Sequence, residues 1–156
     1  MNDPSAATYE ESVSLRFIRH VLLGALVLGV LGTGAELVLL NHVEEFTQWT
    51  PLALIVLALA AIAWYLISGA PASVRALQWL MIAFVVAGFA GFYFHFQASV
   101  EFKLESNPTL NGWKLFWAAM RSKAPPPLAP GVMIQLGLIG LAFAHRHPAL
   151  KSAKKD

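Results

Sequence analysis

The chain contains no cysteine among its 156 residues. It therefore cannot form a disulfide framework, a cysteine-ligated zinc site or an iron–sulfur cluster, and it has no thiol nucleophile. Charged residues are also scarce, at 13% of the sequence against about 25% in soluble domains. Hydrophobic residues reach 57%, above the usual level of about 45–50%. This composition excludes a disordered chain and argues against an ordinary soluble globule.

Signals for other function classes are also missing. The net charge is only +2 and the basic residues are scattered, so nucleic acid is not expected as a partner. The sequence has no strong catalytic or phosphate-binding motif and no H-E-x-x-H metal motif. We therefore assign no catalytic residue and place a binding role ahead of enzymatic turnover.

Four apolar stretches are present instead, each close to the length of about 20 residues that crosses a bilayer. They are apolar on every side, which is typical of helices surrounded by lipid. The sequence thus predicts an all-α polytopic membrane protein, a four-helix up-down bundle spanning 17–145 between tails at 1–16 and 146–156. The predicted spans are 21–40, 51–67, 77–96 and 128–144.

The orientation of the bundle follows from lysine and arginine in the short flanks. Seven of these residues fall on the side of the two tails and four on the other side. Tryptophan residues form one group near each predicted interface, as in an aromatic belt. These patterns predict that both termini are cytoplasmic, and we expect a bacterial plasma (inner) membrane.

The third loop, 97–127, is the only long one, and its pattern predicts a short helix at about 108–121. Asn107 followed by Pro108 is typical of a helix start. Aromatic residues then recur at helical spacing, with Trp113 and Trp117 on one side. Such a helix would lie in the outer membrane interface or pack over the mouth of the bundle.

Two predicted spans carry a line of small residues that ends in an ionisable one. At 100° per residue these lines share one helix face, and small residues let membrane helices approach closely, so both faces should point into the bundle. The lines are Ala25, Gly29, Gly32, Thr33 and Glu36 in the first span, and Ala83, Ala87, Gly91 and His95 in the third.

The outer rim gathers histidine and carboxylate residues that would suit a divalent metal or a proton. The hypothetical site consists of Glu36, His42, Glu45, His95, Glu101 and Glu105. The alternatives are a structural hydrogen bond for Glu36, a solvated loop for His42 and Glu45, and an interfacial anchor for His95. Residues expected to line a pocket or join helices are Thr33, Gln97, Trp113, Trp117 and Gln135.

The other rim offers His20 and His145–His147, a spacing compatible with haem, although flanking basic residues are ordinary at a membrane edge. Three functions therefore remain open. The favoured one is an accessory or ligand-binding subunit within the lipid bilayer, bound to a larger membrane protein complex or to further copies of itself. The alternatives are the outward-facing metal or proton site and a pocket for a lipid or quinone.

Overall fold

The computed structural model describes residues 4–41, 48–123 and 126–152, and this part of the chain is helical, with turns and no strand. The coarse prediction of an all-α protein is therefore confirmed. The helices are α1 (Pro4–Leu39), α2 (Trp49–Ser68), α3 (Pro71–Ser106), α4 (Gly112–Met120), α5 (Gly131–Ala144) and α6 (Pro148–Ser152).

Three helices are long and apolar enough to cross a membrane, namely α1 from Val13 onward, α2 and α3. Large apolar side chains stand exposed along them, including Leu28 (75% exposed), Ile67 (86%) and Trp79 (72%). Such a surface is unfavourable in water and favourable in lipid, so the three helices indicate a membrane location.

The predicted fourth span is shorter than expected. The helix α5 has 14 residues, about 21 Å, against about 30 Å of hydrocarbon. Leu128 and Pro130 lie in turns instead, with Ala129 N–H bonded to the Pro126 carbonyl and Gly131 N–H to that of Leu128. The helix α5 therefore begins three residues after the predicted start of the span at about 128, since the proline-rich entry forms turns.

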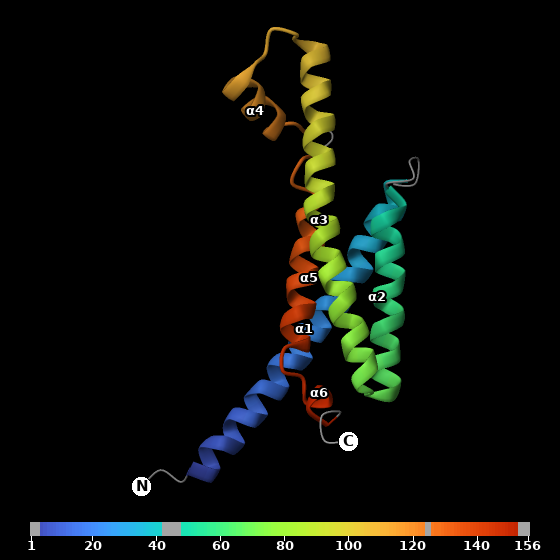
Figure 1. Cartoon of the computed structure of the whole chain (residues 1–156), viewed down its shortest axis with the longest axis vertical. Helices are drawn as coiled ribbons and strands as arrows, with labels where there is room; N and C mark the ends of the chain where they lie inside the picture. Colours follow the sequence, from blue (N-terminus) through green and yellow to red (C-terminus); the bar gives the residue numbers. More distant parts are fainter. Residues whose placement is uncertain (1–3, 42–47, 124–125, 153–156) are drawn as a thin grey trace.

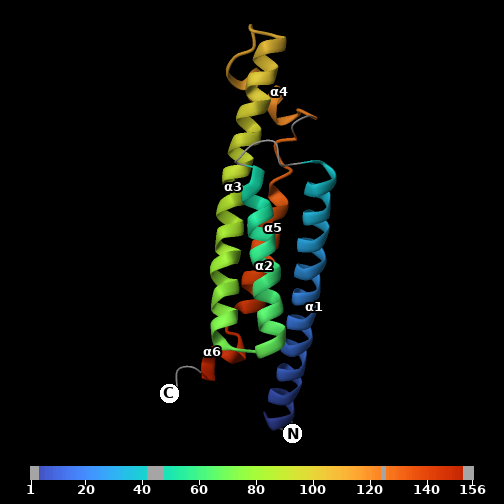
Figure 2. The ribbon, with the colours of Figure 1, turned by 90° about the vertical axis from the view of Figure 1, so that its right-hand side faces the viewer.

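The helices pack in a ring of contacts, in which α1 and α3 each contact both α2 and α5. Figures 1 and 2 show α2, α3 and α5 side by side, while α1 crosses from α5 toward α2. The turn at Gly69 and the helix α6 lie at one end of the molecule, and α4 lies at the other. We call these the α6 end and the α4 end.

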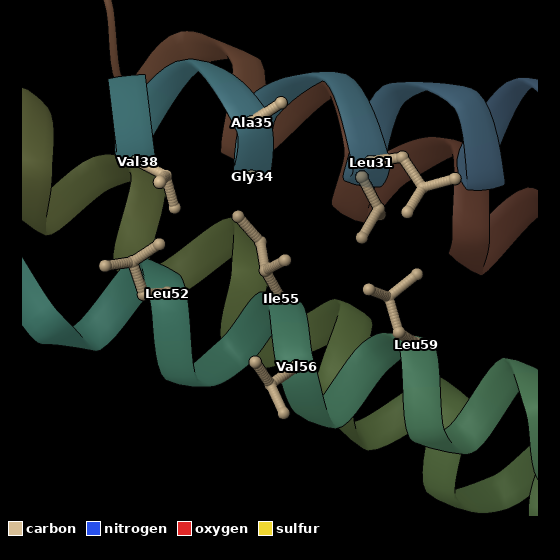
Figure 3. A pocket seen from close by; sticks show the side chains of 9 residues that line it. Leu31, Gly34, Ala35, Val38, Leu52, Ile55, Val56 and Leu59 are labelled. Atoms are coloured by element: carbon tan, nitrogen blue, oxygen red, sulfur yellow. The ribbon is translucent and has the colours of Figure 1, made fainter. Parts of the chain in front are cut away.

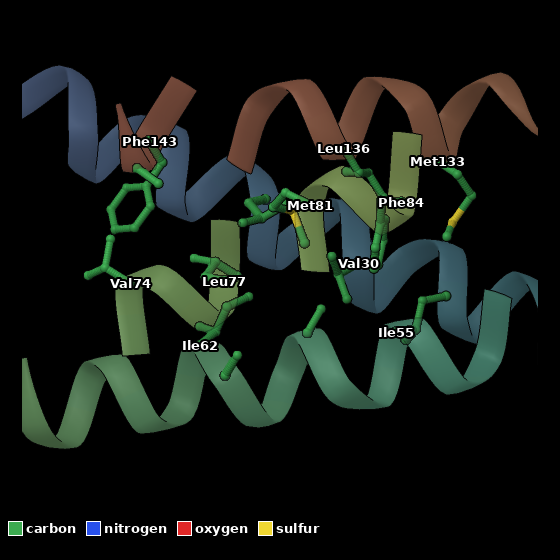
Figure 4. Close-up of a cluster of buried hydrophobic side chains, with 14 residues drawn as sticks. Val30, Ile55, Ile62, Val74, Leu77, Met81, Phe84, Met133, Leu136 and Phe143 are labelled. Atoms are coloured by element: carbon green, nitrogen blue, oxygen red, sulfur yellow. The ribbon is translucent and has the colours of Figure 1, made fainter. Parts of the chain in front are cut away.

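The core lies between the four helices of this ring, and each contributes buried side chains (Figure 4). Leu26 and Val30 enter it from α1, and Phe84 from α3, all fully buried. Its other members are Ile55, Ala58, Ala61, Ile62, Val74, Leu77, Met81, Met133, Leu136, Phe143 and Ala144.

Close approach between α3 and α5 depends on glycine. A Cβ atom at Gly137 would stand 2.7 Å from the carbonyl oxygen of Met81, and one at Gly88 would stand 2.9 Å from the backbone nitrogen of Ile134. Both distances are shorter than real Cβ contacts, so only glycine allows the two backbones to lie this close.

The third and fourth helices also differ from their predicted bounds. The helix α3 extends past 77–96 in both directions and ends at Ser106, so Asn107 follows a helix rather than starting one. Its side-chain oxygen accepts hydrogen bonds from the backbone nitrogen and hydroxyl of Thr109, which turns the chain. The helix α4 then begins at Gly112, four residues after the predicted start.

The helix α4 packs against the extension of α3 beyond the ring and does not cover the mouth of the bundle (Figure 1). Phe96 of α3 meets Phe116 of α4 with ring centroids 5.7 Å apart. The predicted packing over the mouth is therefore wrong, and an interfacial position of α4 stays a prediction.

Candidate functional site

Glu36 does not point into the bundle, contrary to the sequence-based prediction. It is exposed on the last turns of α1. It lies seven residues beyond Gly29, where α1 contacts Leu136 of α5, so both face the same side. The helix α5 begins only five residues before Leu136. The helix α1 also crosses from α5 toward α2 in this direction (Figure 1), and Glu36, beyond the start of α5, is left exposed.

The predicted small-residue face of α1 is divided between the inside and the outside of the molecule. Gly29 and Thr33 face the ring, and Thr33 is 7% exposed. Ala25 and Gly32 are exposed, and a Cβ atom at Gly32 would meet nothing within 4 Å. The predicted inward face is therefore wrong for three of its five residues, Ala25, Gly32 and Glu36, because the buried side is centred on Leu26 and Val30 instead.

His95 joins α3 to the chain segment that enters α5. Its Nδ1 lies 3.1 Å from the carbonyl oxygen of Pro126, which can only accept, so Nδ1 carries the hydrogen. The predicted line below it is half-buried, and Gly91 meets Pro130 of the same segment. His95 therefore has a structural contact that the sequence did not reveal.

The residues of the hypothetical metal site that the structure describes are not brought together. His42 and Glu45 lie outside the described residues, while Glu36, Glu101 and Glu105 are exposed. Within 4–41, 48–123 and 126–152, no three histidine or carboxylate side chains are placed to hold a metal ion. The divalent-metal hypothesis thus gains no support and stays a prediction.

The aromatic residues of the third loop form one cluster on α4. Trp113 stacks on Phe116 with centroids 4.9 Å apart and planes 6° apart, and Trp117 meets both rings edge-on. Trp113 remains 70% exposed. Gln97 is exposed and donates to the Tyr93 hydroxyl over 3.1 Å. The cluster therefore lies partly on the surface, and the pocket for a lipid or quinone stays a prediction.

Two polar side chains of the apolar region are exposed on the same flank. Gln135 was predicted to join helices, but it is exposed on α5. It immediately precedes Leu136, the residue that meets Gly29 of α1. Glu36 follows the same line of α1 toward the α4 end, so both polar groups border the α1–α5 contact. We call this surface the α1–α5 flank.

The other side of α1 forms an apolar groove against α2 (Figure 3). Its volume is about 230 Å³, and Leu31 and Val38 of α1 face Leu59 and Leu52 of α2 across it. The remaining lining residues are Val30, Gly34, Ala35, Ile55 and Val56. The groove has no polar anchor, which a specific quinone pocket would need.

A compact cluster at the α6 end was not predicted. His147, in the turn after α5, is 7% exposed and packs among two aromatic rings. Its Nε2 lies 3.2 Å from the hydroxyl of Tyr65 in α2, and its Nδ1 accepts the Ala149 N–H over 3.2 Å. The neutral ring therefore donates from Nε2 to Tyr65. Phe143 closes the cluster, 5.3 Å from both rings.

Arg19 of α1 is hydrogen-bonded to the same turn. Its guanidinium donates to the carbonyl oxygens of His145 and Arg146, at 3.4 and 3.3 Å, which α5 leaves without helical partners. Its Nε is buried and makes no hydrogen bond to any described residue. Burial lowers the pKa of His147 below its usual 6.5, and the nearby Arg19 charge lowers it further.

Hydrogen bonds within the protein occupy ring nitrogens that would serve as ligands in the haem alternative. Both ring nitrogens of His147 are engaged within the protein, and Nδ1 of His20 donates to the Arg16 carbonyl over 2.8 Å. The sequence showed these histidines at similar depth, but it did not show that Tyr65 and Arg19 meet the turn. The only signal was the cluster of polar residues just after 128–144.

Comparison of the chain with protein-family models, with curated proteins and with solved structures gives no match.

Proposed function

We propose that the protein is a small integral membrane subunit that binds a helix of a larger membrane protein on its α1–α5 flank. In this proposal α1, α2, α3 and α5 cross the membrane as an up-down bundle with both termini on the same side. The exposure of Glu36 within the apolar part of α1 is the observation that carries the proposal.

An ionisable side chain facing lipid costs about 2.5–3.5 kcal/mol at the centre of a span and less near its end. Such residues in membrane helices are therefore usually paired with other polar groups. Within this chain α5 does not cover Glu36, and Gln135 on the same flank is exposed as well. A partner helix would remove both side chains from lipid and supply their hydrogen-bond partners.

The surface around these polar groups suits close helix packing. Gly32 lies one turn before Glu36, with open space above its Cα, and Ala25 lies two turns below Gly32 on the same side. Small residues of this kind let two helix backbones approach.

The chemistry of the flank favours a different protein over a second copy. A symmetric contact would bring two Glu36 carboxyl groups together, and like charges at one site repel. A partner helix with a lysine, arginine or amide side chain at the depth of Glu36 would complement it.

Site-specific photo-crosslinking in native membranes tests this function. A photoreactive residue at Gly32 should give one protein adduct, whereas the same residue at Ala60, exposed on α2, should give none. Glu36→Leu and Gln135→Leu should each reduce the Gly32 adduct severalfold, and Ala90→Leu on the exposed side of α3 should not.

Three results would contradict the proposal. Equal protein adducts from Gly32 and Ala60 would mean that the flank is not selective. Adducts with lipid alone would mean that the flank faces lipid and binds no partner helix. A homodimer adduct that survives Glu36→Leu would replace the different partner with a second copy.

A further inference from the structure

The carboxylates that the structure describes are distributed unevenly along the axis of the molecule. All three carboxylates whose side chains the structure describes, Glu36, Glu101 and Glu105, lie toward the α4 end. The α6 end instead presents arginine residues from three elements, with no carboxylate among the described side chains there. These arginines are Arg16 and Arg19 of α1, Arg75 of α3, and Arg146 of the turn after α5.

The fold brings two of these sequence regions together. Arg19 donates to the backbone carbonyls of His145 and Arg146, so α1 is held directly against the turn that carries Arg146. Arg16 lies one helical turn before Arg19 on the same side of α1. The chain segments that carry these three arginine residues, over 120 residues apart in the sequence, therefore lie at one edge.

The backbone conformation of the turn at Arg146 and the hydrogen bonds of its carbonyl groups support this arrangement. Arg146 has φ +46°, in the left-handed region that arginine rarely adopts. The carbonyls beside it are occupied by Arg19, so they do not compete for the exposed side chains of Arg16 and Arg146. Arg16 and Arg146 therefore present exposed side chains from two neighbouring elements.

The depth of the edge matches that of lipid headgroups. His147, the residue after Arg146, bonds to Tyr65 in the last turn of α2. The neighbouring Trp64 is exposed, as is Trp79 near the start of α3, and tryptophan concentrates at membrane interfaces. The arginine edge therefore lies near the α6 end of the apolar surface, and exposed apolar side chains of α1 such as Phe17 continue beside it.

We propose that Arg16, Arg19 and Arg146 form a binding site for the phosphate headgroup of an anionic phospholipid. Guanidinium groups bind phosphate oxygens through paired hydrogen bonds, and basic pockets between membrane helices hold such headgroups. The acyl chains of the lipid would lie along the exposed apolar side of α1. This site is separate from the α1–α5 flank and does not depend on a partner protein.

Native mass spectrometry of the purified full chain tests the site, with phosphatidylglycerol or phosphatidylcholine added to the detergent micelles. The wild type should retain phosphatidylglycerol preferentially. Arg16→Gln and Arg146→Asn should each weaken this retention about fivefold, the effect of about one basic residue near a membrane surface. Asparagine suits the left-handed backbone at 146, so the turn is kept.

Two controls separate a built site from general positive charge. Arg75→Gln removes a charge at the same end but on α3, which lies across the ring from α1. Arg121→Gln removes one just after α4, at the opposite end. Both variants should retain phosphatidylglycerol like the wild type.

The proposal would be overturned by any of three results. An equal loss in Arg75→Gln would indicate diffuse attraction rather than a site. An equal retention of both lipids by the wild type would show that no anionic site exists. Full competition by inorganic phosphate, added as a separate probe, would assign the site to a free anion.

Discussion

His147 shows how a single residue acquires its role from the fold. In the sequence it belongs to a short basic segment after an apolar stretch, where solvent exposure is the default. In the structure it is buried between Tyr65 and Phe143, with both ring nitrogens hydrogen-bonded. It connects the end of α5 to the end of α2, two helices that have no extensive contact elsewhere.

The burial of His147 predicts that stability depends on pH. Because its pKa is lowered in the folded protein, the unfolded chain takes up the proton first as the pH falls below about 6.5. The stabilising contribution is thus fully present above that pH and is lost as the pH falls toward the folded-state pKa. The thermal midpoint of unfolding of the detergent-solubilised protein should therefore decrease as the pH is lowered from about 7 to about 5.

The matched variants are His147→Gln and His145→Gln. The first should flatten this pH dependence, because glutamine does not titrate. The second removes an exposed imidazole from the same turn and should leave the dependence unchanged. A profile equally steep in the wild type and in His147→Gln would assign the effect to another group.

Among the helices, the pair α3 and α5 depends most on small residues. At Gly137 and Gly88 the backbone of one helix lies so close to the other helix that a Cβ atom would not fit. Gly32 on α1 instead has open space beside its Cα atom. Glycine therefore has two different roles in this protein. At Gly137 and Gly88 it allows a close helix contact, and at Gly32 it lies on an open surface.

Substitution by alanine should distinguish these roles. Gly137→Ala forces a methyl group against the backbone of Met81 and Val85, and should lower the free energy of unfolding by about 1–3 kcal/mol. Gly32→Ala should leave it unchanged or raise it slightly, since alanine favours the helix. Equilibrium unfolding in mixed micelles measures both. Equal losses would show that the α3–α5 approach is not what makes glycine necessary.

At the level of the whole molecule, the question is whether the short helix α5 crosses the membrane. Its 14 residues cover about 21 Å, yet it lies within the ring and contributes Leu136 and Phe143 to the core. Turns at 126–130 precede it and lie against Gly88 and Gly91 of α3. Non-helical backbone at membrane depth is tolerated where protein covers it, and here α3 packs against Pro130, while Leu128 and Ala129 are exposed.

The absence of cysteine makes this topology directly testable. Single cysteines at Ala72 and His145, both exposed at the α6 end, should react with a membrane-impermeant maleimide from one side of sealed vesicles. A cysteine at Ser106, at the far end of α3, should react only from the other side. Reaction of positions 106 and 145 from the same side would show that α5 does not cross.

The existence and approximate bounds of several helices could be predicted from the sequence, because they depend on the composition of each local segment. Apolar stretches predicted α2 within one or two residues, since Pro51 near its start and Gly69 after its end mark the helix locally. The aromatic spacing of the third loop predicted a helix, although Asn107 proved to end α3 rather than to start α4.

The direction that each helix face takes could not be read in the same way. In a soluble protein the polar side marks the outside, but a membrane helix is apolar toward both lipid and protein. Small residues were the remaining guide, and they were correct for Gly29 and wrong for Gly32. Glu36 was placed inside because it continues the line of small residues, a rule that cannot foresee where α5 begins.

The sequence by itself therefore determined that this is a helical membrane protein, because length and hydropathy act on each segment alone. Only the tertiary structure decided that Glu36 and Gln135 border one exposed flank, and that Arg19, Tyr65 and His147 meet at the α6 end. These arrangements depend on the crossing of α1 and on the late start of α5, which arise from contacts between residues far apart in the chain.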